Sequence, residues 1–200
     1  MKKLLFIFAT LFICLITSAQ ETFTKADKLR GSITQERAWW DLQHYKIEVE
    51  VLPEKKTLKG TNTITYKVLA SKKIMQIDLQ EPMKIDKVSQ NGKSLKVERI
   101  GSVHYIRLLR KQKINTENIL VIEFSGSPTE ALNAPWDGGL VWQKDINGKH
   151  FIASANQGIG ASVWWPVKDH PADEPDKGVA LYVTAPKDLV AVGNGRLINQ

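Results

Sequence analysis

Apolar and polar side chains alternate every second residue in several segments of the chain after residue 40. The alternation runs through residues 44–51, 63–68 and 75–79, and further strand-like runs cover 105–109 and 119–124. A period of two places alternate side chains on opposite faces of a strand, so the alternating runs predict half-buried strands with one wet face. No segment beyond residue 40 sustains the 3.6-residue period of a helix. The sequence therefore predicts an all-β fold of antiparallel, twisted sheets.

Short turn signals separate these runs. Asn91-Gly92 and Asn147-Gly148 lie between strand-like segments and predict type I′ hairpins, in which both central residues have positive φ. Residues 53–56 predict the turn that follows the first strand. A turn at Asn194-Gly195 predicts that residues 189–192 form an exposed strand at a sheet edge, where unpaired backbone groups favour association.

The N-terminal residues have the pattern of a secretory signal peptide. Lys2-Lys3 precede an apolar run at residues 4–16, and small residues at 17–19 form a cleavage site. We therefore expect residues 1–19 to be removed by cleavage near Ala19. The mature protein is predicted to be secreted or periplasmic.

The same segment allows two other interpretations. Cys14, the single cysteine, could carry the lipid of a lipoprotein, but Ile13 stands where a lipoprotein signal needs a small residue. The apolar run is also short for a membrane span, which needs about 20 residues. We expect neither a lipid anchor nor a membrane span, and cleavage leaves a mature chain without disulfides.

The rest of the chain divides into a leader and one domain. Residues 20–40 are polar and predict an irregular leader, ending in a short helix that Thr34 could cap. Residues 41–200 form the all-β domain, and a hydrophobic content of 42% permits a sizeable core. The formal charge is +7, but Lys and Glu are scattered along the strands rather than clustered. This pattern is typical of solvated faces, and no nucleic-acid partner is expected.

A dense stretch at residues 164–176 combines adjacent tryptophans with three prolines, Pro166, Pro171 and Pro175. Each proline fixes its own φ, removes a backbone donor and pushes the preceding residue towards extended geometry. The stretch therefore predicts a rigid corner that leads into a strand at residues 179–184.

The acids of this corner have two possible roles. Hard oxygen ligands attract calcium, and a neighbouring histidine would also suit zinc. The residues concerned are Asp169, His170, Asp173, Glu174 and Asp176. The interleaved prolines give them no regular ligand geometry, which favours structural or salt-bridged roles over a metal site.

Two features would suit carbohydrate chemistry. Asp137 and Asp145 could be the paired carboxylates of a glycosidase, although nothing in the sequence fixes their separation. The six tryptophans could form a sugar-stacking face, but tryptophan in a domain of this size is more often a core residue.

Several segments, taken together, resemble a known family. Gln157 precedes Trp-Trp-Pro-x-Lys-Asp-x-Pro at 164–171, and an apolar strand ending at Ala185-Pro186 precedes Leu-x-Ala-Val-x-Asn-Gly at 189–195. Upstream stand Trp40-Asp-Leu-Gln-His-Tyr45 and Leu58-Lys-Gly60. In this order and spacing the segments resemble the amino-terminal domain of the aminopeptidase N family of zinc metallopeptidases, the gluzincins.

The resemblance implies a saddle-like or sandwich β domain that caps the active-site cleft of a secreted zinc metallo-aminopeptidase. Such an enzyme removes N-terminal residues from peptides. In the family, a Gln or Glu nine residues before the Pro of Pro-x-x-Asp-x-Pro accepts a hydrogen bond from the substrate's α-ammonium group. Here Gln157 occupies that position before Pro166, and it is the one substrate-binding residue that the resemblance assigns. The implied partners are the N-terminus of a peptide substrate and the family's catalytic domain.

The family's zinc motif, His-Glu-x-x-His, is absent. None of the histidines, His44, His104, His150 and His170, is followed by Glu, and the family's Gly-x-Met-Glu-Asn strand is missing too. We therefore expect the zinc ligands and all catalytic residues of the full-length enzyme to lie beyond Gln200, leaving the domain incomplete at its C-terminal end. This chain alone is predicted to bind no zinc and to be inactive. The alternative is a secreted β-sandwich module that binds carbohydrate or protein.

Overall fold

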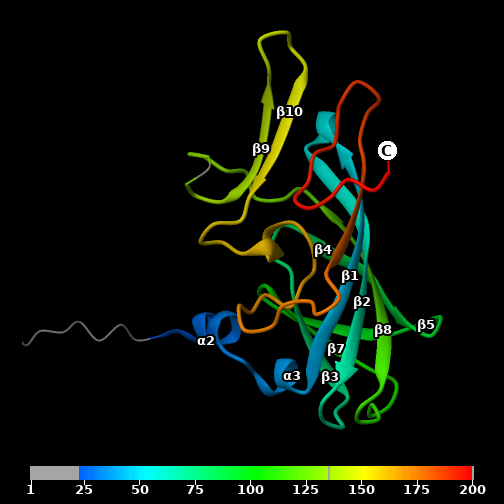
Figure 1. The fold of residues 1–200 in the computed structure, drawn as a ribbon. Helices are drawn as coiled ribbons and strands as arrows, with labels where there is room; N and C mark the ends of the chain where they lie inside the picture. The colour runs from blue at the N-terminus through cyan, green and yellow to red at the C-terminus, as the bar shows by residue number, and fades with distance from the viewer. Residues whose placement is uncertain (1–22, 135, 200) are drawn as a thin grey trace, which may run out of the picture.

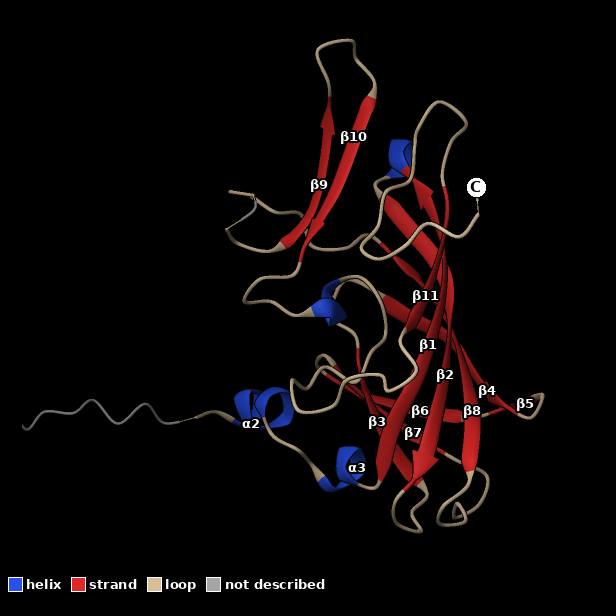
Figure 2. Cartoon of the chain, viewed as in Figure 1, coloured by secondary structure: helices blue, strands red, loops and turns tan. Residues whose placement is uncertain are grey.

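The computed structural model describes residues 23–134 and 136–199, so the predicted signal peptide lies outside the described part. Most of the regular structure is strand (Figure 2). The strands are β1 (Trp40–Leu52), β2 (Thr57–Val68), β3 (Ile74–Asp78), β4 (Lys84–Gln90), β5 (Lys93–Ser94), β6 (Lys96–Ile100), β7 (Val103–Arg107), β8 (Glu117–Gly126), β9 (Gly139–Lys144), β10 (His150–Ala155) and β11 (Val179–Thr184). The helices are α2 (Lys25–Gly31) and α3 (Gln35–Ala38), with 3₁₀ turns η1 (Pro53–Lys55) and η2 (Ala161–Val163).

Residues 23–134 and 136–199 form three sheets. A six-stranded sheet has the order β11-β1-β2-β8-β4-β5, a three-stranded sheet the order β3-β7-β6, and β9 pairs with β10 in a separate ribbon (Figure 1). The prediction of an all-β fold is confirmed.

One strand pair departs from the expected antiparallel pattern. β11 runs parallel to β1, with Tyr45 opposite Val179 at the start of the ladder. The preceding corner is fixed at the beginning of β1, because the amides of Asp176 and Lys177 donate to the carbonyls of Leu42 and Gln43. The chain therefore enters β11 beside the start of β1, and the two strands run the same way.

The alternation in β1 has the predicted burial. Tyr45, Ile47 and Val49 are buried in the core, while the residues between them lie on the more exposed face. A register shift between Leu42 and His44 adds one residue to β1 relative to β2. Such a bulge changes the phase of a strand, so Leu42 and Tyr45, three positions apart, are both buried.

β3 is buried on both faces, whereas its alternation predicted one wet face. Met75 and Ile77 are fully buried apolar residues, and the polar residues Gln76 and Asp78 are buried as well. The reason is tertiary: α3 packs against β3, and the corner forms a bridge between Asp78 and Val167.

The leader contains a helix that the sequence analysis did not assign. α2 begins after Thr24 with a capping box, in which the Thr24 hydroxyl accepts from the Asp27 amide and the Asp27 carboxylate accepts from the Thr24 amide. The short helix predicted after Thr34 is present as α3, but the Thr34 hydroxyl does not cap it. In residues 23–134 and 136–199 no helix is long and apolar enough to cross a membrane.

The turn predictions have mixed outcomes. Asn91 and Gly92 both have positive φ between β4 and β5, as predicted. Asn147-Gly148 also joins paired strands, but only Gly148 has positive φ, and the Asp145 side chain organises the loop by accepting from two backbone amides. The strand predicted at residues 189–192 is wrong, because that segment forms no strand in the structure.

Candidate substrate-binding loop

Gln157 lies in the loop of residues 156–160, directly after β10. In Figure 1 this loop and η2, drawn in gold, lie between the β9–β10 hairpin and α2. Gln157 is exposed, and no hydrogen bond among the described residues uses its side chain. Gly158 and Gly160 both have positive φ, and the Gly160 amide donates to the Asn156 carbonyl at 2.9 Å. The loop is therefore a tight turn that leaves the Gln157 amide free to accept or donate.

Gln80, just after β3, holds the far side of this loop. Its side-chain Nε2 donates to the Ile159 carbonyl at 2.5 Å and to the Ser162 hydroxyl at 2.8 Å. Its backbone amide donates to the Ser162 carbonyl at 2.8 Å. The Ile159 side chain also packs where Gly138 has no Cβ, since a side chain there would overlap it. The segment that follows β3 of the three-stranded sheet thus fixes the residues after Gln157.

Asp169 of the corner fixes the same loop from a third direction. The Ser162 hydroxyl donates to Asp169 Oδ2 at 2.5 Å, and the Asp169 amide donates to Asp78 Oδ2 at 3.1 Å. The carboxylate lies so close to Gly160 that a Cβ at that position would overlap it. Gly160 is therefore required both for its φ of 82° and for this close approach.

The corner packs on the six-stranded sheet through several contacts, and its rigidity stays a prediction. The Asn62 side chain donates to the Pro166 carbonyl at 2.8 Å. Trp165 packs edge-on against Tyr45, with ring centroids 4.8 Å apart, and the Lys168 amide donates to the Tyr45 hydroxyl at 2.9 Å. Both aromatic residues are buried, so this corner is fixed on the six-stranded sheet by packing as well as by hydrogen bonds.

Lys168 is a buried cation at the centre of the corner. Its Nζ donates to the Trp40 carbonyl at 2.6 Å, lies 4.2 Å from the centroid of the Trp40 ring and pairs with Asp173. Burial lowers the pKa of the Lys168 ammonium, and the hydrogen bond to Asp173 opposes that shift. Desolvation also raises the pKa of Asp41, and the nearby carboxylates of Asp173 and Asp176 raise it further.

The corner acids have separate partners instead of a common centre. Asp169 accepts a hydrogen bond from the Ser162 hydroxyl, and Asp173 pairs with Lys168. Asp176 accepts from the side-chain Nε2 of Gln43 at 2.9 Å. Over the described ranges, no group of three or more His, Cys, Asp or Glu residues is arranged to hold a metal ion. The calcium or zinc interpretation of these acids gains no support from the structure.

The residues of the carbohydrate interpretation also have structural roles or lie apart. Asp137 accepts from the amides of Leu132 and Asn133 at 2.6 and 2.7 Å, and these backbone hydrogen bonds lower the pKa of its carboxyl. Asp145 caps its own hairpin loop in the same way. Of the six tryptophans only Trp136 is exposed, so they form no common stacking face.

Comparison with known families now bears on this geometry. The sequence model of the Peptidase M1 N-terminal domain matches residues 42–200. The chain belongs to the M1 peptidase family through this domain. The match begins two residues into β1 and continues through β11, including the loop of Gln157 and the corner, but it does not include the leader. A comparison with curated proteins returns no match.

Solved structures of M1 enzymes have the same fold. An M1 zinc metallopeptidase from Deinococcus radiodurans superposes with a TM-score of 0.66 at 21% identity, over 82% of this chain and 36% of that one. Its E323A mutant bound to a Tyr-Ser-Ala substrate gives 0.66 at 22% identity, over 82% and 37%. Native yeast LTA4 hydrolase gives 0.58 at 18% identity, over 74% and 23%. The chain thus spans about a third of the length of the metallopeptidases that it matches.

Proposed function

We propose that this M1 domain caps the active site of a zinc metallo-aminopeptidase that removes N-terminal residues from peptides. The family match supports the proposal, and a solved relative is described as a zinc metallopeptidase bound to a tripeptide substrate. The protein is exported, since residues 1–19 have the pattern of a signal peptide. The alternative is a secreted β-sandwich module that binds carbohydrate or protein. Among the tryptophans, all of which are described, only Trp136 is exposed, so the carbohydrate version lacks a stacking face.

The chemistry of zinc is assigned to the rest of the enzyme. The described residues contain no suitable group of ligands, and the sequence has no His-Glu-x-x-His. Zinc in such enzymes polarises the carbonyl that is attacked and lowers the pKa of the attacking water. This domain contributes recognition of the substrate.

Gln157 is the residue to which we assign that recognition. The observation that carries the assignment is an exposed, unbonded amide on a loop that is fixed from three directions, by Gln80, Asp169 and the Gly160 turn. The Oε1 atom of a side-chain amide can accept a hydrogen bond from an ammonium group, and Gly158 lets a ligand approach the backbone closely. Gln157 thus binds the α-ammonium group of the substrate. Because a neutral amide attracts a cation less strongly than a carboxylate does, a partner carboxylate is expected on the catalytic domain.

The test uses the enzyme that contains this domain and its catalytic domain. Gln157→Ala removes one hydrogen bond to a charged group, which costs about 1.5–3 kcal/mol, or roughly tenfold to over a hundredfold in kcat/KM. We expect this loss for dipeptides with a free amine, and a much smaller loss for their N-acetylated forms. Gln143→Ala, at an exposed glutamine of the β9–β10 hairpin that precedes this loop, is the control. Wild-type cleavage of free-amine substrates by Gln157→Ala would exclude Gln157 as an anchor.

A further inference from the structure

A fully buried arginine links the leader to the three-stranded sheet. The Arg37 side chain has no solvent exposure, and its Nη1 donates to the carbonyls of Arg30 and Ser32 at 3.1 and 2.7 Å. Its Nη2 lies 2.7 Å from Asp78 Oδ2 as an ion pair, without the direction of a linear hydrogen bond. One guanidinium therefore ties the end of α2 to the end of β3.

Gln76, on the same strand, makes a second attachment. Its Nε2 donates to the Leu29 carbonyl at 3.1 Å, and the Thr34 hydroxyl donates to its Oε1 at 2.6 Å. Gln76 is fully buried, so these hydrogen bonds satisfy polar groups that would otherwise be costly. With Arg37, they fix three successive parts of the leader relative to β3.

The leader so fixed contacts the loop of Gln157. Arg30, exposed on α2, donates from Nη2 to the Gly158 carbonyl at 3.1 Å. A second connection starts at Asp78, which pairs with Arg37 and also accepts from the Asp169 amide. The Ser162 hydroxyl donates to Asp169. The Gln80 side chain donates both to that hydroxyl and to the Ile159 carbonyl of the loop. Leader and loop are thus linked both directly and through the corner.

We propose that residues 24–38 of the leader form a positioning element for the loop of Gln157, with Arg30 as its contact and Arg37 as its anchor. The match to the family model begins at residue 42, after this element. The inference rests on the proposed function in one respect: the loop that Arg30 holds is the one that binds the substrate's ammonium group.

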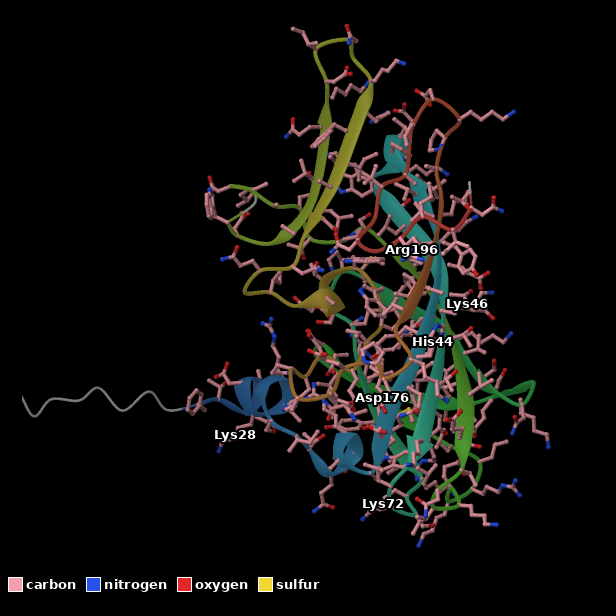
Figure 3. All side chains as sticks on the ribbon, viewed as in Figure 1. Lys28, His44, Lys46, Lys72, Asp176 and Arg196 are labelled. Carbon is pink, nitrogen blue, oxygen red and sulfur yellow. The ribbon has the colours of Figure 1, made fainter. Side chains whose placement is uncertain are left out.

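The first test measures the loop itself, without any assay of activity. Hydrogen–deuterium exchange of a peptide that spans residues 156–160 is compared in wild type, Arg30→Ala and Lys28→Ala. Both residues are exposed on α2, and Lys28 is labelled in Figure 3. Losing one hydrogen bond should raise exchange of the loop by about twofold to tenfold in Arg30→Ala. Lys28→Ala should exchange like wild type, since the Lys28 side chain makes no hydrogen bond or ion pair with the described residues. Equal exchange in the two variants would overturn the inference.

The second test is kinetic and uses the enzyme with its catalytic domain. An arginine that only positions a binding loop affects ground state and transition state alike, so Arg30→Ala should raise KM for free-amine substrates by about twofold to tenfold and leave kcat unchanged. An unchanged KM, or a fall in kcat alone, would overturn the positioning role. Gln157→Ala tests the proposed function separately: if that variant is fully active while Arg30→Ala still loosens the loop, the assignment of Gln157 fails and the contact with the leader stands.

Discussion

A buried histidine makes the stability of this protein depend on pH. His104, on β7, is 2% exposed and is directed into the core on the same side of the strand as Ile106. Its Nδ1 is buried without a hydrogen-bond partner. Burial lowers the pKa of the imidazole to about 4, and the charge of Arg99 on the neighbouring strand adds to the shift. The folded protein therefore keeps this side chain neutral.

The direction of the effect follows from the two states. In the unfolded chain the histidine titrates near its ordinary pKa of about 6.5. As the pH falls below that value the unfolded state takes up a proton first, so stability is lost from about pH 6.5 down to about pH 4 and is fully present above that range. Between pH 7 and pH 5 the imidazole should cost about 2 kcal/mol of unfolding free energy.

The measurement compares wild type with His104→Gln, whose side chain is neutral at both pH values. Urea unfolding followed by tryptophan fluorescence gives the free energy of unfolding at pH 7 and pH 5. Wild type should lose about 2 kcal/mol more than the variant over this interval. Asp41 and Asp78, whose pKa values burial raises, act in the opposite direction, but they are present in both proteins and cancel in the comparison.

A second variant shows whether the effect belongs to this site. His44, labelled in Figure 3, lies half-buried on the face of β1 opposite to the core residue Tyr45. His44→Gln therefore removes one imidazole without changing a core side chain. If His104→Gln and wild type lose stability in parallel, the reasoning is refuted. If His44→Gln flattens the profile as much as His104→Gln does, the buried imidazole is not the cause.

Two further predictions concern the corner and the N-terminus. Lys168→Met leaves Asp173, whose side chain is only 12% exposed, without its cation and should destabilise the fold by about 3 kcal/mol. Lys177→Met, which breaks an exposed pair, should cost at most about 1 kcal/mol, and similar losses in urea unfolding would contradict the assigned role of burial. Mature protein from the native host should begin at or within a residue or two of Gln20, after Ala19, and intact-mass data that show an uncleaved N-terminus or a lipid would contradict export by this route.

Local signals in the sequence predicted much of the fold. The alternation of Tyr45, Ile47 and Val49 is a property of one strand, since burial of one face requires only a period of two. Asn91-Gly92 forms its predicted turn because the requirement for positive φ is local. The capping box of Thr24 and Asp27 is a signal of the same kind, and it could have revealed α2.

The candidate loop was found from sequence, but its support was not. The family resemblance assigned Gln157 by its position before Pro166, whereas nothing near it in the sequence indicates that Gln80 and Arg30 hold its neighbours. Arg30 lies 128 positions from Gly158, and no periodic pattern reports a contact over such a distance. Gln80 and Arg30 belong to no sequence motif, and only the folding of distant segments brings them to the loop.

What the sequence by itself determined is therefore local: the alternation of strands such as β1 and the turn at Asn91-Gly92. The assignment of Gln157 comes from the family resemblance and stays a proposal. Tertiary structure decided the parallel pairing of β11 with β1, the burial of Gln76 and Asp78 on the second face of β3, and the separate partners of Asp169, Asp173 and Asp176. The physical reason is the range of the forces involved. Periodicity and turn geometry depend on neighbouring residues, whereas the partner of a buried charge depends on which distant segment excludes water from it.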